Sequence, residues 1–105
     1  LAAARQSGFH AQQGIYVGFT GPNYETRAEY RLVRKIGGDV VGMSTVPEAI
    51  TANQLGMQVL GLSVVTNVAR PDAPATVDAG EVVEVAGIAQ PKMESIVRAV
   101  LRSLK

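Results

Sequence analysis

Three short polar segments of this sequence carry side chains that could act together in chemistry. They are Gly21-Pro22-Asn23-Tyr24-Glu25-Thr26, Gly42-Met43-Ser44-Thr45-Val46-Pro47 and Thr66-Asn67. Tyr24 offers an aromatic face, and the Glu25 carboxylate can accept hydrogen bonds from the N–H groups of a planar ligand. Asn67 can present both a donor and an acceptor to a heterocycle.

Each segment also has a purely structural interpretation. Glu25 and the residue after it could simply begin a helix, because a carboxylate is favourable at a helix N-terminus. Ser44 or Thr45 could only cap the next helix. The alternative is that the Ser44 hydroxyl and the free N–H groups of that helix bind an anion such as phosphate. Asn67 could be an ordinary turn residue.

Composition excludes several classes of function. The chain has 105 residues, with 10 Lys+Arg, 9 Asp+Glu, one His and no Cys. A net charge of +1 gives no electrostatic basis for binding nucleic acid or an anionic membrane. Without Cys there are no disulfides or thiolate zinc sites, and His10 alone cannot build a multi-His metal site. The basic residues of one predicted helix are expected to form a solvated face: Arg27, Arg31, Arg34 and Lys35.

The elements that must position these residues alternate along the chain. Apolar runs and turn residues predict strands at 15–20, 39–43 and 58–66, and helices at 27–36, 46–55 and 79–104. Pairs with capping-box spacing are expected to begin the first two helices, Thr26 with Glu29 and Thr45 with Glu48. Pro91 is expected to kink or divide the last helix.

This order predicts an α/β fold with a parallel sheet. In such sheets, ligands bind outside the carboxyl ends of the strands, so we expect segments 20–26, 42–48 and 66–72 to converge. Strand 58–66 is almost continuously apolar, which is typical of a strand that is covered on both faces and has neighbours. The chain supplies few neighbours and begins within an apparent helix, so we expect a piece of a longer domain.

Three motifs resemble, in wording and spacing, the C-terminal part of the trimeric purine nucleoside phosphorylases. They are Gly21-Pro22-Asn23-Tyr24-Glu25-Thr26, Gly42-Met43-Ser44-Thr45-Val46-Pro47-Glu48 and Gly61-Leu62-Ser63-Val64-Val65-Thr66-Asn67. The resemblance covers residues 14–105. It implies that residues 1–105 are the C-terminal portion of one three-layer nucleoside phosphorylase domain whose N-terminal half is absent.

The resemblance implies phosphorolysis of 6-oxopurine ribo- and deoxyribonucleosides to the free base and (deoxy)ribose 1-phosphate. Inorganic phosphate is then a co-substrate, and neither a cofactor nor a metal is needed. The family further implies a cytoplasmic, homotrimeric enzyme of purine salvage in its full-length form. A pentosyltransferase of this kind has no nucleic-acid or membrane partner.

The resemblance also implies a role for each matching residue. Glu25 would accept from the N1–H of the base, and Asn67 would bind the N7/O6 edge and stabilise the leaving group. Both are therefore the expected catalytic residues. The remaining expected contacts are Tyr24 on the base, Met43 on the ribose, Ser44 on the phosphate, and Val41 and Thr66 in the base pocket.

Two alternatives remain open. The related methylthioadenosine phosphorylases share the second motif but carry Ser and Asp at the positions of Glu25 and Asn67. The chain could instead be a truncated remnant without catalysis, at most a weak purine binder. It also departs from the family's pattern, because Gly80 stands where a His usually lies near the ribose 5′-hydroxyl. Arg27 replaces a small residue or Pro.

Overall fold

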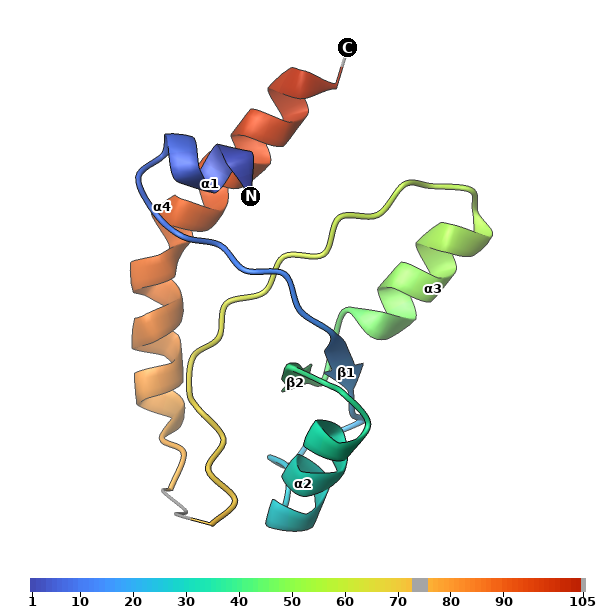
Figure 1. Cartoon of the computed structure of the whole chain (residues 1–105), viewed down its shortest axis with the longest axis vertical. Coiled ribbons are helices and arrows are strands. Elements are labelled where there is room, and N and C mark those ends of the chain that lie inside the picture. The colour runs from blue at the N-terminus through green and yellow to red at the C-terminus, as the bar shows by residue number, and fades with distance from the viewer. Residues whose placement is uncertain (73–75, 105) are drawn as a thin grey trace. The chain divides into compact units, whose positions relative to one another are not determined.

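A computed structural model describes residues 1–72 and 76–104 of the chain. The described residues form two compact units. One unit combines residues 1–13 with residues 77–104, and the other runs from residue 14 to residue 76. Figure 1 shows the helices and strands of both units.

The unit that starts at residue 14 has a strand–helix–strand–helix order. Its elements are β1 (Tyr16–Gly18), α2 (Arg27–Lys35), β2 (Val40–Gly42) and α3 (Val46–Gln54). The strands pair in parallel, with a register that runs from Tyr16 opposite Val40 to Gly18 opposite Gly42. The predicted α/β organisation is confirmed, although both strands are shorter than the predicted ranges 15–20 and 39–43.

Side-chain and backbone bonds extend the strand pairing at both ends. The Ile15 N–H donates to the Asp39 carboxylate at 2.8 Å, just before the strands begin. The Phe19 N–H donates to the Gly42 carbonyl at 2.8 Å, just after β1 ends. These two bonds fix the register, because a slip by one residue would break both of them.

Helix α2 begins and ends as its residues predict. The Thr26 N–H donates to the Glu29 carboxylate at 3.0 Å, and the Glu29 N–H donates to the Thr26 hydroxyl at 3.2 Å. This is a complete capping box. After the helix, Gly37 has a φ of +89°, which glycine adopts without steric cost. A Cβ at Gly38 would lie 2.5 Å from Val17, so only glycine lets the chain pass here into β2.

The third predicted strand, residues 58–66, is not formed. The segment is extended, and half-buried Leu62 and Val64 alternate with exposed neighbours, as on one face of a strand. No backbone hydrogen bond joins residues 58–72 to any other described residue. Its apolar pattern therefore predicted the right extended conformation, but a strand also needs a partner to complete its ladder.

The other unit packs helix α1 (Ala2–Gln6) on helix α4 (Ala79–Ser103). Ala4 is buried within it, and the Lys92 ammonium lies 5.9 Å from the centre of the Phe9 ring. The Asp78 carboxylate caps α4 by accepting from the N–H of Gly80 at 2.8 Å. No helix in residues 1–72 and 76–104 is both long and apolar enough to cross a membrane.

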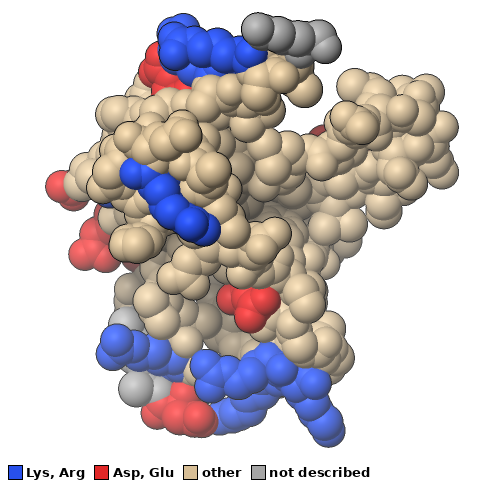
Figure 2. All heavy atoms as spheres, turned by 45° about the horizontal axis from the view of Figure 1, so that its top comes forward, with Lys and Arg blue, Asp and Glu red and all other residues tan. Residues whose placement is uncertain are grey.

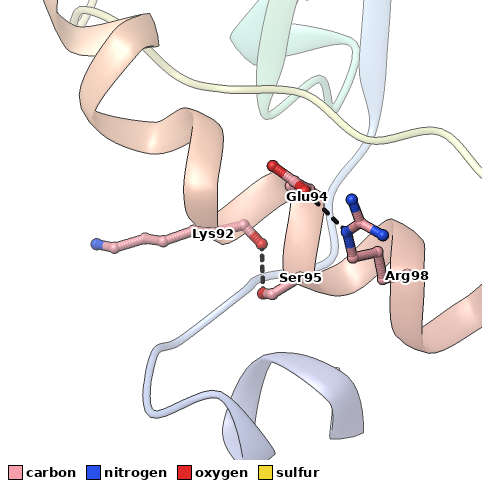
Figure 3. A network of polar contacts seen from close by, with 4 residues as sticks. All are labelled: Lys92, Glu94, Ser95 and Arg98. Carbon is pink, nitrogen blue, oxygen red and sulfur yellow. Dashed lines mark hydrogen bonds and ion pairs between the residues drawn. The ribbon is translucent and has the colours of Figure 1, made fainter.

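Helix α4 continues through Pro91 and is not divided there. Its axis bends along its length in Figure 1, as a proline inside a helix predicts. Beyond the proline, the Ser95 hydroxyl donates to the Lys92 carbonyl at 2.7 Å, and Arg98 donates to the Glu94 carboxylate at 2.7 Å (Figure 3).

We predict that the isolated 105-residue chain unfolds in urea without a steep transition. Among the described residues, only the side chains of Ala4 and Val33 are buried hydrophobic ones, and segment 58–66 lacks ladder partners. Cooperativity requires a large buried surface, and the m-value scales with that surface. Circular dichroism at 222 nm against urea measures it. A single steep transition with m above about 1 kcal/mol/M would contradict the prediction.

Candidate functional site

Parallel pairing of β1 and β2 brings the first two polar segments to one edge of the sheet. The residues after Gly18 and after Gly42 leave the strands at the same end. Gly21, with a φ of +67°, packs under the Met43 side chain, and a Cβ there would lie 2.5 Å from the Met43 sulfur. Segments 20–26 and 42–48 are therefore in contact.

Tyr24 and Glu25 stand immediately before the capping box of α2. The Tyr24 side chain is half exposed, whereas Glu25 is half-buried. Burial raises the pKa of Tyr30, and the charge and hydrogen bonding of the neighbouring Glu25 carboxylate raise that pKa further. The Glu25 carboxylate therefore lies beside Tyr30, at the start of a helix whose first turn is fixed by Thr26.

The turn between β2 and α3 has an unusual backbone. The Val46 N–H donates to the Ser44 carbonyl at 2.8 Å, and Thr45 has a φ of +74° and a ψ of −49°. These angles define the rare γ-turn with positive φ, which is strained for a β-branched residue. The predicted cap by Thr45 and Glu48 is wrong, because no side chain caps α3. In this conformation the Thr45 hydroxyl lies 3.2 Å from that of Ser44 instead.

The start of α3 leaves few donors for an anion. The Val46 N–H is already used, and Pro47 has no N–H. Within residues 1–72 and 76–104, the Glu48 N–H is the first-turn amide of α3 that has no hydrogen-bond partner. An anion here would therefore meet this amide and the exposed Ser44 hydroxyl, rather than a full ring of N–H groups.

Thr66 and Asn67 form a polar pair at the end of the extended segment. The Thr66 hydroxyl donates to the Asn67 side-chain oxygen at 2.9 Å. Thr66 is half-buried and Asn67 is exposed at a bend. The bond uses one lone pair of the Asn67 oxygen, and within the described residues no hydrogen bond involves the NH₂ group, which can donate to a ligand. Val41, the other predicted pocket residue, is half-buried in the middle of β2.

One contact at this site was missed by the sequence analysis. Arg31 of α2 donates to the carboxylate of Asp72, 41 positions along the chain, although the pattern predicted only a solvated basic face. This hydrogen bond, together with the charge of Arg31, lowers the pKa of Asp72. No local spacing relates the two residues, so no sequence signal could have found the pair.

An open groove lies on one face of α3 and holds none of the predicted site residues. Its volume is about 410 Å³. It is lined by Pro47, Glu48, Thr51, Ala52, Leu55 and Met57. The candidate site therefore consists of the polar side chains that follow β1 and β2 together with the Thr66–Asn67 pair, and does not include this groove.

Known proteins resemble this chain in sequence and in fold. Residues 1–102 match the model of the phosphorylase superfamily. The chain is 45% identical over 103 residues to purine nucleoside phosphorylase 1 of Geobacillus stearothermophilus, covering 96% of this chain and 37% of that protein. Two structures of the Schistosoma mansoni purine nucleoside phosphorylase, with adenosine and with inosine, each align over 99% of this chain at 34% identity and a TM-score of 0.91.

The chain therefore belongs to the phosphorylase superfamily, and its fold is part of the fold of the purine nucleoside phosphorylases. It spans a little over a third of the length of these two relatives: 37% of the Geobacillus protein and 39% of the Schistosoma chain with adenosine.

We predict that Glu25→Gln lowers the pKa of Tyr30 without returning it to the ordinary value of tyrosine. The substitution removes the charge of residue 25, but burial, the largest cause of the shift, remains. Absorbance at 295 nm against pH, with a Tyr30→Phe variant subtracted, measures this pKa. Because folding raises the pKa, the contribution of Tyr30 to folding stability is lost as pH rises from the ordinary tyrosine pKa through the raised one, and Glu25→Gln loses less.

Glu29→Gln is the matched control for this titration. Glutamine keeps the capping box, and the charge of Glu29 is a smaller cause of the Tyr30 shift than Glu25 is. An equal or larger pKa change in Glu29→Gln than in Glu25→Gln would show that Glu25 does not lie beside Tyr30.

Proposed function

We propose that this chain supplies the purine-binding part of a purine nucleoside phosphorylase that acts on 6-oxopurine ribo- and deoxyribonucleosides. The observation that carries the proposal is the presence of Glu25 after β1 and of Asn67 after the extended segment 58–66 in a chain of the phosphorylase superfamily. The named relatives support it, because the compared proteins are purine nucleoside phosphorylases.

In the proposed reaction, a phosphate oxygen attacks C1′ of the nucleoside. The C1′–N9 bond breaks, and its electron pair moves into the purine, where the charge spreads toward N7 and O6. The NH₂ group of Asn67 donates to this edge, while the Glu25 carboxylate accepts from N1–H. The Asn67 contact strengthens as negative charge builds on the base, so it lowers the barrier more than it tightens ground-state binding. The Glu25 contact holds the base in place by its N1–H.

Glu25 also supplies the proposed choice of base. A carboxylate accepts the N1–H of hypoxanthine and guanine, whereas neutral adenine presents a lone pair at N1. The mismatch would leave buried polar groups unpaired, which costs a large factor in kcat/KM. One compared Schistosoma structure contains adenosine and another contains inosine, so occupancy in that relative does not discriminate between the bases.

The other proposed contacts follow from a base that is held by Glu25 and Asn67. Tyr24 packs on the base, Val41 and Thr66 line its pocket, and Met43 lies against the ribose. Ser44 contributes one phosphate contact, and the Glu48 N–H adds a second donor beside it. Two donors hold phosphate poorly, so the remaining phosphate ligands are proposed to come from an N-terminal half of the same domain in a cytoplasmic homotrimer.

A second candidate function is purine binding without turnover. The chain spans 37% of the length of its Geobacillus relative. If residues 1–105 act by themselves, the base-reading side chains are present but phosphate is not oriented for attack.

We predict that a polypeptide combining these residues with an N-terminal half cleaves inosine only when phosphate is present. Phosphate is the nucleophile, so hydrolysis cannot replace phosphorolysis. Release of hypoxanthine is followed with and without phosphate, and ribose 1-phosphate is identified as the second product. Cleavage at an equal rate without phosphate would contradict the proposal. Binding of hypoxanthine without any cleavage at saturating phosphate would favour the second candidate.

We predict that Glu25→Ala in the same polypeptide lowers kcat/KM for inosine at least ~10²-fold. The loss corresponds to a charge-assisted hydrogen bond of up to ~3 kcal/mol. Steady-state kinetics with saturating phosphate measures it. Glu84→Ala, which removes an exposed carboxylate of α4, is the control and should leave kcat/KM unchanged. An unchanged value for Glu25→Ala would remove Glu25 from the base site.

A further inference from the structure

Few polar contacts hold the segment that carries Thr66 and Asn67. No backbone hydrogen bond joins residues 58–72 to any other described residue, and the Thr66–Asn67 bond is internal to the segment. Within the described ranges 1–72 and 76–104, one side-chain hydrogen bond leaves the segment, from Arg31 to Asp72. Sheet pairing of residues 58–66 in a longer domain would leave residues 67–72 beyond the strand, and within the described ranges the ion pair is the side-chain hydrogen bond that holds this part of the segment.

Helix α2, which carries Arg31, holds one partner of the ion pair in a regular helix. Its first turn is closed in both directions by the capping box of Thr26 and Glu29. Glu25 directly precedes this box, and Arg31 lies in the second turn of the same helix. A short, regular piece of helix thus connects Glu25 to Arg31 with little freedom.

Asp72, the second partner of the ion pair, lies close to Asn67 along the chain. The Arg31 Nη2 and Asp72 Oδ1 atoms are 2.5 Å apart, and Asp72 follows Asn67 by five residues. Five extended residues span at most about 17 Å, so the ion pair limits how far Asn67 can move from α2.

The surface around the ion pair is complementary to the Asp72 carboxylate. Arg27, Arg31 and Arg34 have the spacing of one helix face, and the charges of all three lower the pKa of Asp72. Figure 2 shows basic side chains gathered at the bottom of the view, where α2 lies. The carboxylate therefore stays ionised at neutral pH, and it retains two further attractive charges if Arg31 is neutralised.

We propose that Arg31 and Asp72 are positioning residues for purine recognition, which tie the segment that carries Asn67 to the helix that follows Glu25. The inference rests on the proposed function, because it takes Glu25 and Asn67 as the two residues that read the base. Without the ion pair, a smaller fraction of molecules holds both side chains in the binding arrangement. The apparent affinity for the nucleoside falls by that fraction.

The test compares Asp72→Asn with Glu94→Gln in the phosphorylase polypeptide. Each substitution removes one exposed carboxylate that pairs with an arginine, and the Glu94–Arg98 pair lies in α4 (Figure 3). We expect Asp72→Asn to raise KM for inosine about 3- to 5-fold with kcat nearly unchanged. Glu94→Gln should change neither. Exposed ion pairs add little to stability, so both variants should keep the wild-type melting temperature.

Two further variants show whether the charge pairing itself is responsible. Asp72→Glu keeps the carboxylate and should restore KM to within about 2-fold of wild type. Arg31→Gln should raise KM less than Asp72→Asn, because Arg27 and Arg34 remain near the carboxylate. The double variant Arg31→Gln with Asp72→Asn should raise KM by less than the product of the two single-variant increases. Equal KM values for Asp72→Asn and Glu94→Gln, or fully multiplicative effects, would overturn the proposal.

A measurement without turnover separates this inference from the proposed function. Residues 1–105 contain no Cys, so spin labels can be placed at Ala28→Cys and Val68→Cys in the complete protein once any other cysteine is replaced. Val68 is 74% exposed and adjoins Asn67. We expect a narrow distance distribution that broadens in Asp72→Asn. Distance distributions of equal width in the wild type and in Asp72→Asn would overturn the positioning role of the ion pair, even if inosine is cleaved. Broadening without inosine cleavage would retain the anchor and reject the proposed function.

Discussion

Parallel pairing of β1 with β2 is the interaction on which the rest of the unit that starts at residue 14 depends. A parallel pair needs a crossover, which α2 supplies, and it sends both strands out of the sheet at one edge. The bonds at Ile15–Asp39 and Phe19–Gly42 hold the register at each end. Because that register is fixed, the short loops after the strands meet, and Met43 packs on Gly21. The polar side chains gather there as a consequence of sheet geometry.

Elements governed by local chemistry could be predicted from the sequence. Helix α2 has a capping box and a glycine exit, and its observed bounds differ from the predicted range 27–36 by one residue. The same spacing failed at Thr45, because the γ-turn before α3 turns the hydroxyl away from the helix amides. The extended conformation of residues 58–66 could be predicted from their almost continuous apolar run. The absence of hydrogen-bond partners for this segment among the described residues could not be predicted, because such partners are a property of the whole sheet.

The candidate site likewise has features that could be predicted from the sequence and features that could not. The position of Glu25 before a capped helix and of Ser44 before α3 could be predicted, because each depends on a few neighbouring residues. The anchor between Arg31 and Asp72 could not, since 41 positions separate them and their types are common on solvated surfaces. Roles for Asn67 and Glu25 came from resemblance to a family, whereas the effect of Glu25 on the pKa of Tyr30 came from the structure.

Within residues 1–72 and 76–104, no backbone hydrogen bond pairs residues 58–66 with another strand, and this has a consequence for how the chain behaves at high concentration. The segment contains no charged residue and no proline, and it is rich in β-branched and aliphatic side chains. Val59, Leu60 and Val65 are each more than half exposed. An exposed, uncharged edge of this kind is a template for cross-β association between copies. Covering this segment is therefore a condition of solubility as well as of sheet formation.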